Sequence, residues 1–264
     1  MSIIRSTSNP LFKRIRKFEQ RKFRKKEGVG YVDGIRSVLT AAEYAPRLIE
    51  KVIVSPELLT GNLALGRLYD LIPRDQIIEF SADLLRALSP RDNPAGMGAI
   101  VQSPVVPIEK FAPPTPSSRY LVLDRIGDPG NLGTMIRTVD GAGFNGIILT
   151  GHGVDVLHQT TLKASLGTAF VVPIAQASVD QISQWASIQA VQLIGTSANT
   201  QFDYAQLHPS GPLALLLGNE REGLSADLSQ LVSQMIKIPM RGQASSLNVA
   251  VAAGILMYSL QVQP

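Results

Sequence analysis

The sequence contains no cysteine, which excludes disulfide bonds and thiolate chemistry. Its three histidines, His152, His158 and His208, show no metal-binding spacing such as HExxH. The N-terminus lacks the apolar core of a signal peptide, and no apolar run is long enough to span a membrane. These absences favour a soluble cytoplasmic protein that uses no metal ion and contacts no membrane.

Charged residues are also scarce, at 17% of the 264 residues, whereas hydrophobic residues make up 45%. A chain of this kind can form one large domain or two smaller ones with a real core. The charge that is present is unevenly distributed: the net charge is +4, yet residues 1–26 hold ten lysines or arginines and one acid, Glu19. Such a block indicates contact with a polyanion, or else a solvated face or a disordered tail.

Within this basic block, the apolar residues Leu11, Ile15 and Phe18 recur at helical spacing. The pattern predicts an ordered basic helix that packs one face against the protein.

Strands and helices alternate along the rest of the chain, which predicts an α/β fold. In the first hundred residues we expect a helix at 82–88 and a strand at 97–102. Residues 103–118 contain five prolines, a density typical of an extended connector. The alternation restarts at residue 119. We therefore predict an α/β domain over residues 1–103, a proline-rich linker over 104–118 and a second α/β domain over 119–264.

In the second domain, a continuous apolar strand of the buried parallel type is expected at residues 120–123. Further strands are expected at 146–150, 171–173, 191–196 and 213–217, with a helix at 157–166 and another at 179–187.

The first of three polar loops in this domain covers residues 124–138 and follows the strand at 120–123. Asn131 suits the N-cap of the next helix, after a Pro-Gly turn. Arg137 falls on the same helix face as Asn131, near the helix start, where a cation is unfavourable for the helix dipole. This placement indicates either a bound anion or a surface ion pair with Asp128 or Asp140.

The second loop covers residues 215–224 and begins as a buried strand that ends in Gly218. A glycine at this point lets a ligand approach the backbone closely. Asn219 and Glu220 then stand where α/β folds bind ligands, beyond the carboxyl ends of the strands. The alternative is a tight charged turn in which Glu220 pairs locally with Arg221.

The third loop lies within residues 236–258, after a short strand at 235–238 that stops at Pro239. From about Leu247 the chain is apolar on nearly every side, which predicts a helix buried on all faces. Ser246 and Asn248 stand at its entry, where they either cap the helix or contact a ligand.

Three such loops after buried strands favour one shared binding site. The dinucleotide-binding pattern GxGxxG and the phosphate-binding pattern GxxxxGK[ST] are both absent, so neither type of nucleotide site is supported.

Taken in order, the three loops resemble the motifs of the SpoU (TrmH-like) family of the SPOUT methyltransferases. Asn131, Gly133 and Arg137 correspond to the first motif, residues 217–224 to the second, and 238–240 with 246–248 to the third. The N-terminal part looks like the L30e-like substrate-binding domain of that family, through the basic helix, Ser8-Asn9-Pro10 and Asp33-Gly34, where many relatives have Glu before the glycine.

The resemblance implies a parallel sheet with a deep trefoil knot, S-adenosylmethionine bound in the knot, and a homodimer with its active site at the subunit interface. It implies methylation of a ribose 2′-hydroxyl, with 23S ribosomal RNA the favoured substrate and transfer RNA the alternative. A non-catalytic RNA-binding protein is the competing class. The presence of all the motif residues together argues against it.

The resemblance also implies roles for individual residues. The expected cofactor-binding residues are Thr196, Ser197, Leu217, Gly218, Ile238, Met240 and Leu247. The expected catalytic residues are Arg137, Asn131, Glu220, Ser246 and Asn248. The expected RNA-binding residues are Lys13, Arg14, Arg21, Lys22 and Arg24. Arg137 has been proposed in the family to help deprotonate the hydroxyl. Because a guanidinium stays protonated in proteins, we expect it to bind phosphate and stabilise negative charge on the 2′-oxygen.

Overall fold

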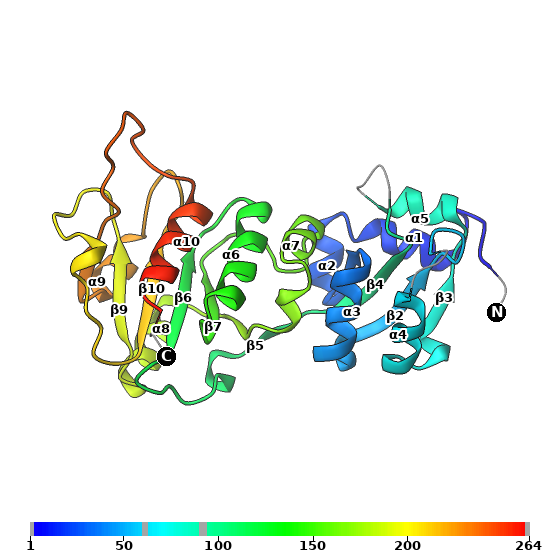
Figure 1. Ribbon diagram of the computed structural model, residues 1–264, viewed down its shortest axis with the longest axis horizontal. Helices are drawn as coiled ribbons and strands as arrows, with labels where there is room; N and C mark the ends of the chain where they lie inside the picture. Colours follow the sequence, from blue (N-terminus) through cyan, green and yellow to red (C-terminus); the bar gives the residue numbers. More distant parts are fainter. Residues whose placement is uncertain (1–2, 60–62, 90–93, 262–264) are drawn as a thin grey trace. The chain divides into compact units, whose positions relative to one another are not determined.

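The computed structural model describes residues 3–59, 63–89 and 94–261 (Figure 1). The chain forms two compact units. Unit 1 contains residues 1–104 and Asp155–Val171, and unit 2 contains Val105–Val154 and Val172–Pro264. The segment 155–171 was expected in the second domain, but it packs within unit 1.

Unit 1 is built on a four-stranded sheet with the order β1-β4-β2-β3. Strand β4 is antiparallel to β1 and β2, and β2 is parallel to β3. The strands are β1 (Val29–Asp33), β2 (Ile49–Val54), β3 (Ile77–Glu79) and β4 (Met97–Gln102). The helices are α1 (Pro10–Lys17), α2 (Arg21–Glu27), α3 (Ile35–Tyr44), α4 (Ala64–Leu71), α5 (Ala82–Leu88) and α7 (Gln159–Ala164), with short 3-10 turns η1 (Pro46–Leu48), η2 (Arg74–Gln76) and η4 (Thr168–Phe170). The predicted bounds of α5 and β4 are confirmed.

The single basic helix predicted near the N-terminus is two helices, α1 and α2. Asn9 caps α1 by accepting a hydrogen bond from the Leu11 amide at 2.9 Å. Ile15 and Phe18 are buried in the unit 1 core, as predicted. Helix α1 ends at Lys17, and the carbonyls of Phe18 and Glu19 just beyond it accept hydrogen bonds from the Arg24 guanidinium of α2.

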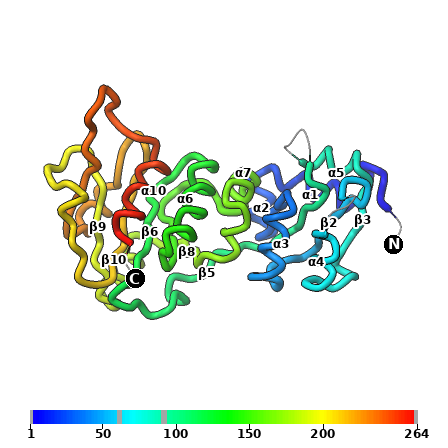
Figure 2. Tube along the Cα trace, viewed as in Figure 1, coloured from blue at the N-terminus to red at the C-terminus, as the bar shows by residue number. Residues whose placement is uncertain are grey.

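Strand β1 lies at the edge of its sheet, yet all five of its residues are buried. The segment 155–171 covers it, and α7 packs directly against β1. The contact is close at Gly30, where an added Cβ would lie 2.9 Å from the Leu157 carbonyl oxygen. The path of this segment around α7 can be followed in Figure 2. A part of the chain distant in sequence thus covers this edge.

Unit 2 is built on a seven-stranded, fully parallel sheet with the order β11-β9-β10-β6-β7-β8-β5. The strands are β5 (Val105–Val106), β6 (Arg119–Asp124), β7 (Gly146–Thr150), β8 (Ile174–Gln176), β9 (Gln192–Thr196), β10 (Leu213–Leu217) and β11 (Gln234–Ile236). The helices are α6 (Pro129–Gly141), α8 (Val179–Ile188), α9 (Ala226–Leu231) and α10 (Val249–Ser259), with 3-10 turns η3 (Ile108–Lys110) and η5 (Tyr204–Gln206). The strand predicted at 171–173 lies instead at β8, and the predicted bounds of β7 and β10 are confirmed.

The proline-rich segment is part of unit 2 rather than a free linker. Strand β5 pairs with β8, and Ile108 is buried in the unit 2 core. The ring of Phe111 stacks on Tyr120 with centroids 5.9 Å apart. Prolines limit the regular structure of this segment, but its apolar side chains still reach the core.

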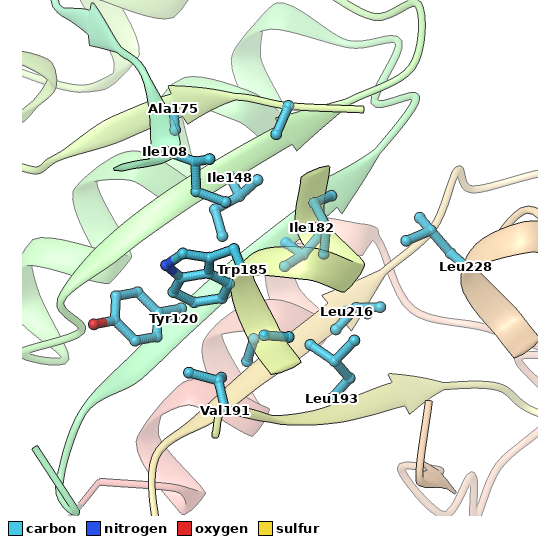
Figure 3. Packing of buried hydrophobic residues seen from close by; sticks show 14 residues of the cluster. Ile108, Tyr120, Ile148, Ala175, Ile182, Trp185, Val191, Leu193, Leu216 and Leu228 are labelled. Atoms are coloured by element: carbon cyan, nitrogen blue, oxygen red, sulfur yellow. The ribbon is translucent and has the colours of Figure 1, made fainter. Parts of the chain in front are cut away.

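Alternate residues of the central strands face opposite sides of the sheet. Tyr120 and Leu216 face the side covered by α8 and α9, where they pack with Trp185 and Leu228 (Figure 3). Tyr120 and Trp185 meet edge to face with ring centroids 5.0 Å apart. This cluster anchors the strands whose carboxyl ends carry the motif loops.

Helix α10 packs beside α6 (Figure 1). Its burial on all faces was predicted, and this is wrong for the single chain. Val251, Ile255 and Tyr258 are 51%, 37% and 55% exposed and form one stripe along the helix. Apolar composition alone does not identify the partner of each face.

The buried guanidinium of Arg119 holds the end of α10 against the sheet. It donates to the carbonyl oxygen of Leu260 at 3.1 Å, and also to those of Pro116, Ser118 and Gly211. Burial lowers the pKa of Arg119 from its ordinary value.

Among the residues that the structure describes, no helix has the length and apolar character needed to cross a membrane.

Candidate active site

A cavity of about 450 Å³ lies beyond the carboxyl ends of the adjacent strands β9, β10 and β11. Its walls come from the loops that follow these strands and from the start of α10. All seven residues predicted to bind a cofactor line it: Thr196, Ser197, Leu217, Gly218, Ile238, Met240 and Leu247. Neighbouring parallel strands end at one edge of a sheet, so residues far apart in sequence meet there.

The loop after β10 folds back on itself at Gly218. A Cβ added to Gly218 would lie only 2.0 Å from the carbonyl carbon of Gly223, which no side chain tolerates. Gly223 has φ +70° and donates its amide to the Asn219 carbonyl at 2.8 Å. The two glycines therefore make a tight loop that lines the cavity.

Asp128, rather than Asn131, caps helix α6. Its carboxylate accepts the Asn131 amide hydrogen at 2.7 Å. The prediction of Asn131 as N-cap is wrong because the Pro-Gly pair forms the first turn of the helix instead of preceding it.

The Asn131 side chain instead joins the three motif loops. Its Nδ2 donates to Glu220 Oε1 at 2.8 Å, and its Oδ1 accepts from Asn248 Nδ2 at 3.1 Å. Asn248 is the N-cap of α10, since its Oδ1 accepts from the amides of Ala250 and Val251. A continuous chain of hydrogen bonds thus links the start of α6, the loop after β10 and the start of α10.

The structure places the residues of two alternatives that the sequence left open. Asn248 caps α10, whereas Ser246 lines the cavity. Glu220 also lines the cavity and bonds to Asn131, and no ion pair joins it to Arg221 within the described residues.

Arg137 is exposed on α6, two turns from Asn131. Over the described ranges of the chain it forms no ion pair, neither with Asp128 nor with Asp140, and it does not line the cavity of its own chain. Its guanidinium is therefore open to an external anion.

Arg125 is a residue that the sequence reasoning missed. It is not a glycine, yet it has φ +55°, in the left-handed region that side chains rarely adopt. Its Nε donates at 3.2 Å to the buried Asp124, and this hydrogen bond raises the pKa of Arg125. No spacing or composition signal marks such a backbone conformation.

Through this conformation, Arg125 and Asp124 hold the loop after β10. The Arg125 guanidinium pairs with Glu222 and donates to the Gly223 carbonyl at 3.3 Å. The Arg125 carbonyl accepts from Asn219 Nδ2 at 3.0 Å, and Asp124 Oδ2 accepts the Ser225 amide at 2.7 Å. Four contacts therefore fix the segment 219–225, most of which lines the cavity.

In unit 1, the buried Arg24 is occupied by internal partners. It donates to the carbonyls of Phe18 and Glu19 at 2.7 and 2.9 Å. Its other donors bind both carboxylate oxygens of Asp155, at 3.1 and 2.9 Å. The predicted contact of Arg24 with RNA does not agree with this geometry, because all of these donors point inward.

The other predicted RNA contacts differ from one another. Arg14 pairs with Glu50 and also donates to Glu27 at 2.9 Å, and the hydrogen bond to Glu50 raises the pKa of Arg14. Arg21 lies 3.9 Å from Asp155. Lys13 and Lys22 are exposed. Only part of the predicted basic set is therefore presented to solvent.

No cluster of three or more metal-ligating side chains occurs in the part of the chain that the structure describes.

Comparison with known protein families matches both parts of the chain. The profile of the SpoU rRNA Methylase family matches residues 118–258, and that of an MRM3-like substrate binding domain matches residues 9–99. A Bacillus subtilis protein named 23S rRNA (guanosine(2553)-2'-O)-methyltransferase RlmP is 30% identical over 99% of this chain and 100% of its own length. A Streptomyces viridochromogenes protein named 23S rRNA (uridine(2479)-2'-O)-methyltransferase is 31% identical over 70% of this chain and 67% of its own.

Solved structures give the same result. The AdoMet-bound rRNA methyltransferase from Sinorhizobium meliloti superimposes with a TM-score of 0.87 and 31% identity, covering 98% of this chain and 97% of that one. The SpoU methyltransferase AviRb from Streptomyces viridochromogenes superimposes with a TM-score of 0.85 and 27% identity, covering 96% of both chains.

The fold, the cavity and these matches define an RNA methyltransferase that uses S-adenosylmethionine. Within that class, the chain belongs to the SpoU rRNA Methylase family.

Proposed function

We propose that this protein methylates the 2′-hydroxyl of a ribose in 23S ribosomal RNA. The names of two relatives share the 2′-O position and 23S rRNA but differ in the base, guanosine in one and uridine in the other. The sugar hydroxyl is therefore the methyl acceptor that both names share, and we propose no particular base for this protein. Such a substrate would place the protein in the cytoplasm.

The observation that carries the proposal is that the second and third motif loops line one cavity, and that the Glu220–Asn131–Asn248 hydrogen bonds join the first motif loop to them. The cavity volume lies in the range of small-molecule sites. The fold-back at Gly218 brings main-chain groups of the loop after β10 to the cavity wall, because no Cβ separates Gly218 from Gly223. We assign S-adenosylmethionine to this cavity, held by the seven lining residues named above.

Bound S-adenosylmethionine supplies a sulfonium methyl group that an oxygen nucleophile can attack. For the RNA, we assign to Arg137 the binding of a phosphate beside the target ribose. Its fixed positive charge also stabilises the negative charge that develops on the 2′-oxygen. It does not remove the proton, because a guanidinium does not act as a base near neutral pH. As the oxygen takes the methyl group and the bond from methyl to sulfur breaks, the hydroxyl proton passes to solvent water.

The neutral polar residues have positioning roles in this scheme. Ser246 presents a hydroxyl at the cavity wall and can orient the ribose hydroxyl. Asn131 and Asn248 hold α6 and α10 in register with the loop that carries Glu220. Geometry of this kind contributes to rate by keeping the reacting groups close together and aligned.

We also propose that the protein is a homodimer. The exposed stripe of Val251, Ile255 and Tyr258 is an apolar surface of the kind that a second copy covers. In such a dimer, Arg137 would serve the cavity of the other copy, which accounts for its absence from its own. Sedimentation equilibrium should give a dimer for the wild type and a monomer for Val251→Asp, whereas a monomeric wild type would contradict the proposal.

The trefoil knot is part of the same proposal. Strand β11 lies at one edge of the sheet, and the chain then returns so that α10 packs against α6 and near η5. A return of this kind is what a threaded C-terminal helix requires.

The decisive experiment has two stages. Calorimetry with S-adenosylmethionine should give one site per chain. Labelled methyl groups should then enter 23S rRNA taken from cells that lack the protein, and the labelled position should resist alkaline cleavage because its 2′-oxygen is blocked. Label in transfer RNA alone would mean that transfer RNA, and not 23S rRNA, is the substrate. Cofactor binding without label in any RNA would favour a non-catalytic RNA-binding protein.

A further inference from the structure

Five lysines on α1 and α2 are exposed and form no ion pair with any carboxylate in the described residues: Lys13, Lys17, Lys22, Lys25 and Lys26. The arginines of the same helices behave differently, since Arg14 and Arg24 are tied to carboxylates. The arginines fix the two helices, and the lysines supply their outer charge.

Helix α2 is short, but its position is well defined. Arg24 ties it to the end of α1 and to Asp155, and Gly28 ends it with φ +68°. A surface fixed in this way loses little conformational entropy when it binds a ligand.

Phe23 stands among these lysines and is only half-buried. The ammonium group of Lys22 lies 5.1 Å from the centre of its ring, and that of Lys17, from α1, lies 5.6 Å away. An aromatic ring open to solvent and flanked by cations is the arrangement with which proteins bind single-stranded nucleic acid.

We propose that Phe23, Lys17 and Lys22 form a subsite for one unpaired nucleotide of the RNA substrate. The base stacks on the ring of Phe23 in place of the ammonium groups, which then contact the phosphates on either side. A base inside a duplex cannot reach the ring, so the subsite selects unpaired RNA. This inference rests on the proposed RNA substrate and names the part of it that unit 1 recognises.

The test uses fluorescence anisotropy to measure the affinity of the full-length protein for a 12-nucleotide oligouridylate and for a 12-base-pair RNA duplex. Phe23→Leu keeps an apolar side chain but removes the aromatic face, and should weaken oligouridylate binding about tenfold while leaving duplex binding unchanged. Phe23→Tyr keeps the face and should bind nearly as the wild type does. Thermal unfolding of each variant verifies its fold.

The lysines are tested through salt dependence. The double variant Lys17→Gln with Lys22→Gln should lower the slope of log affinity against log salt by roughly 1.4, about 0.7 for each lost phosphate contact to a single strand. Lys110→Gln removes an exposed lysine of unit 2 and should leave the slope unchanged.

The subsite would be overturned if Phe23→Leu bound oligouridylate with wild-type affinity, or if it lost affinity equally for the single strand and the duplex. An unchanged salt slope in the double lysine variant would overturn it as well. These assays require no methyl transfer. If the Phe23→Leu variant methylates RNA normally and also binds oligouridylate as tightly as the wild type, the subsite is refuted and the proposed function is not. If the variants show the predicted differences in binding but the wild-type protein methylates no RNA, the proposed function is refuted and the subsite is not.

Discussion

The cavity loops of unit 2 and the basic helices of unit 1 are two candidate binding surfaces built in different ways. At the cavity, main-chain groups and short polar side chains are set by the ends of parallel strands, and all seven predicted residues line one space. On α1 and α2, binding would depend on long charged side chains, and three of the five predicted ones pair with carboxylates of the chain itself. In this protein, strand order brought the predicted cavity residues together, whereas charge content did not show which cations are paired.

The physical reason lies in the partners of each charge. Arg14 and Arg24 pair within the chain, with Glu50 and Asp155 respectively. Both acids come from distant parts of the sequence. The four predictions below test this contrast between surfaces set by the backbone and surfaces set by charge.

The largest effect is expected at Arg137, the exposed cation of unit 2. Arg137→Ala should lower the turnover of methyl transfer by about 100-fold or more, since in the proposed scheme it removes the charge that stabilises the reacting oxygen. The affinity for S-adenosylmethionine should change by less than about twofold, because Arg137 does not line the cavity. Steady-state kinetics and calorimetry measure the two quantities. Loss of cofactor binding in a folded variant would contradict the assigned role.

The next effect separates two neighbours on α2. Arg24→Gln should lower the free energy of unfolding by about 2–3 kcal/mol, because it leaves Asp155 and two carbonyls without their donor. Lys25→Gln, one residue further, should leave stability nearly unchanged. Urea unfolding measures both. Equal stabilities would mean that the internal ion pair contributes nothing.

A smaller effect is expected at Arg125, which holds the loop after β10. Arg125→Ala should weaken S-adenosylmethionine binding about tenfold, because segment 219–225 loses its contacts with the guanidinium. Arg125→Gly accepts the positive φ without strain and should lose the same affinity with less loss of stability. If Arg125→Gly restored the affinity, backbone strain rather than the guanidinium would be responsible.

The smallest effect on stability is expected at Asn248. Asn248→Ala removes the cap of α10 and should cost about 1 kcal/mol of unfolding free energy. Asn248→Asp keeps the capping oxygen but loses the amide that donates to Asn131. It should therefore retain stability and still lower turnover. If Asn248→Asp turned over at the wild-type rate, the Glu220–Asn131–Asn248 hydrogen bonds would not contribute to methyl transfer.

Several elements of the fold were predictable because their signals are local. The bounds of α5, β4, β7 and β10 agree with the apolar runs and the turn residues that frame them. The convergence of the three motif loops was also predictable, since the carboxyl ends of neighbouring parallel strands share one edge. Their roles in binding and catalysis remain proposals.

Other features depend on contacts between distant residues. The prolines of residues 104–118 suggested a connector, but β5 pairs with β8 and Ile108 enters the core. Asn131 looked like a cap, yet Asp128 takes that role and Asn131 reaches two other loops. In each case the local pattern was compatible with two structures, and long-range packing selected one.

By itself, the sequence determined the α/β class, most strand positions and the loops that would meet, because hydrophobic periodicity and chain reversals are encoded within a few residues. Only the tertiary structure decided which arginines are buried, which strand edge segment 155–171 covers and where Arg125 takes its left-handed conformation. These outcomes depend on groups brought together from distant positions in the chain, and their energies exist only once the chain has folded.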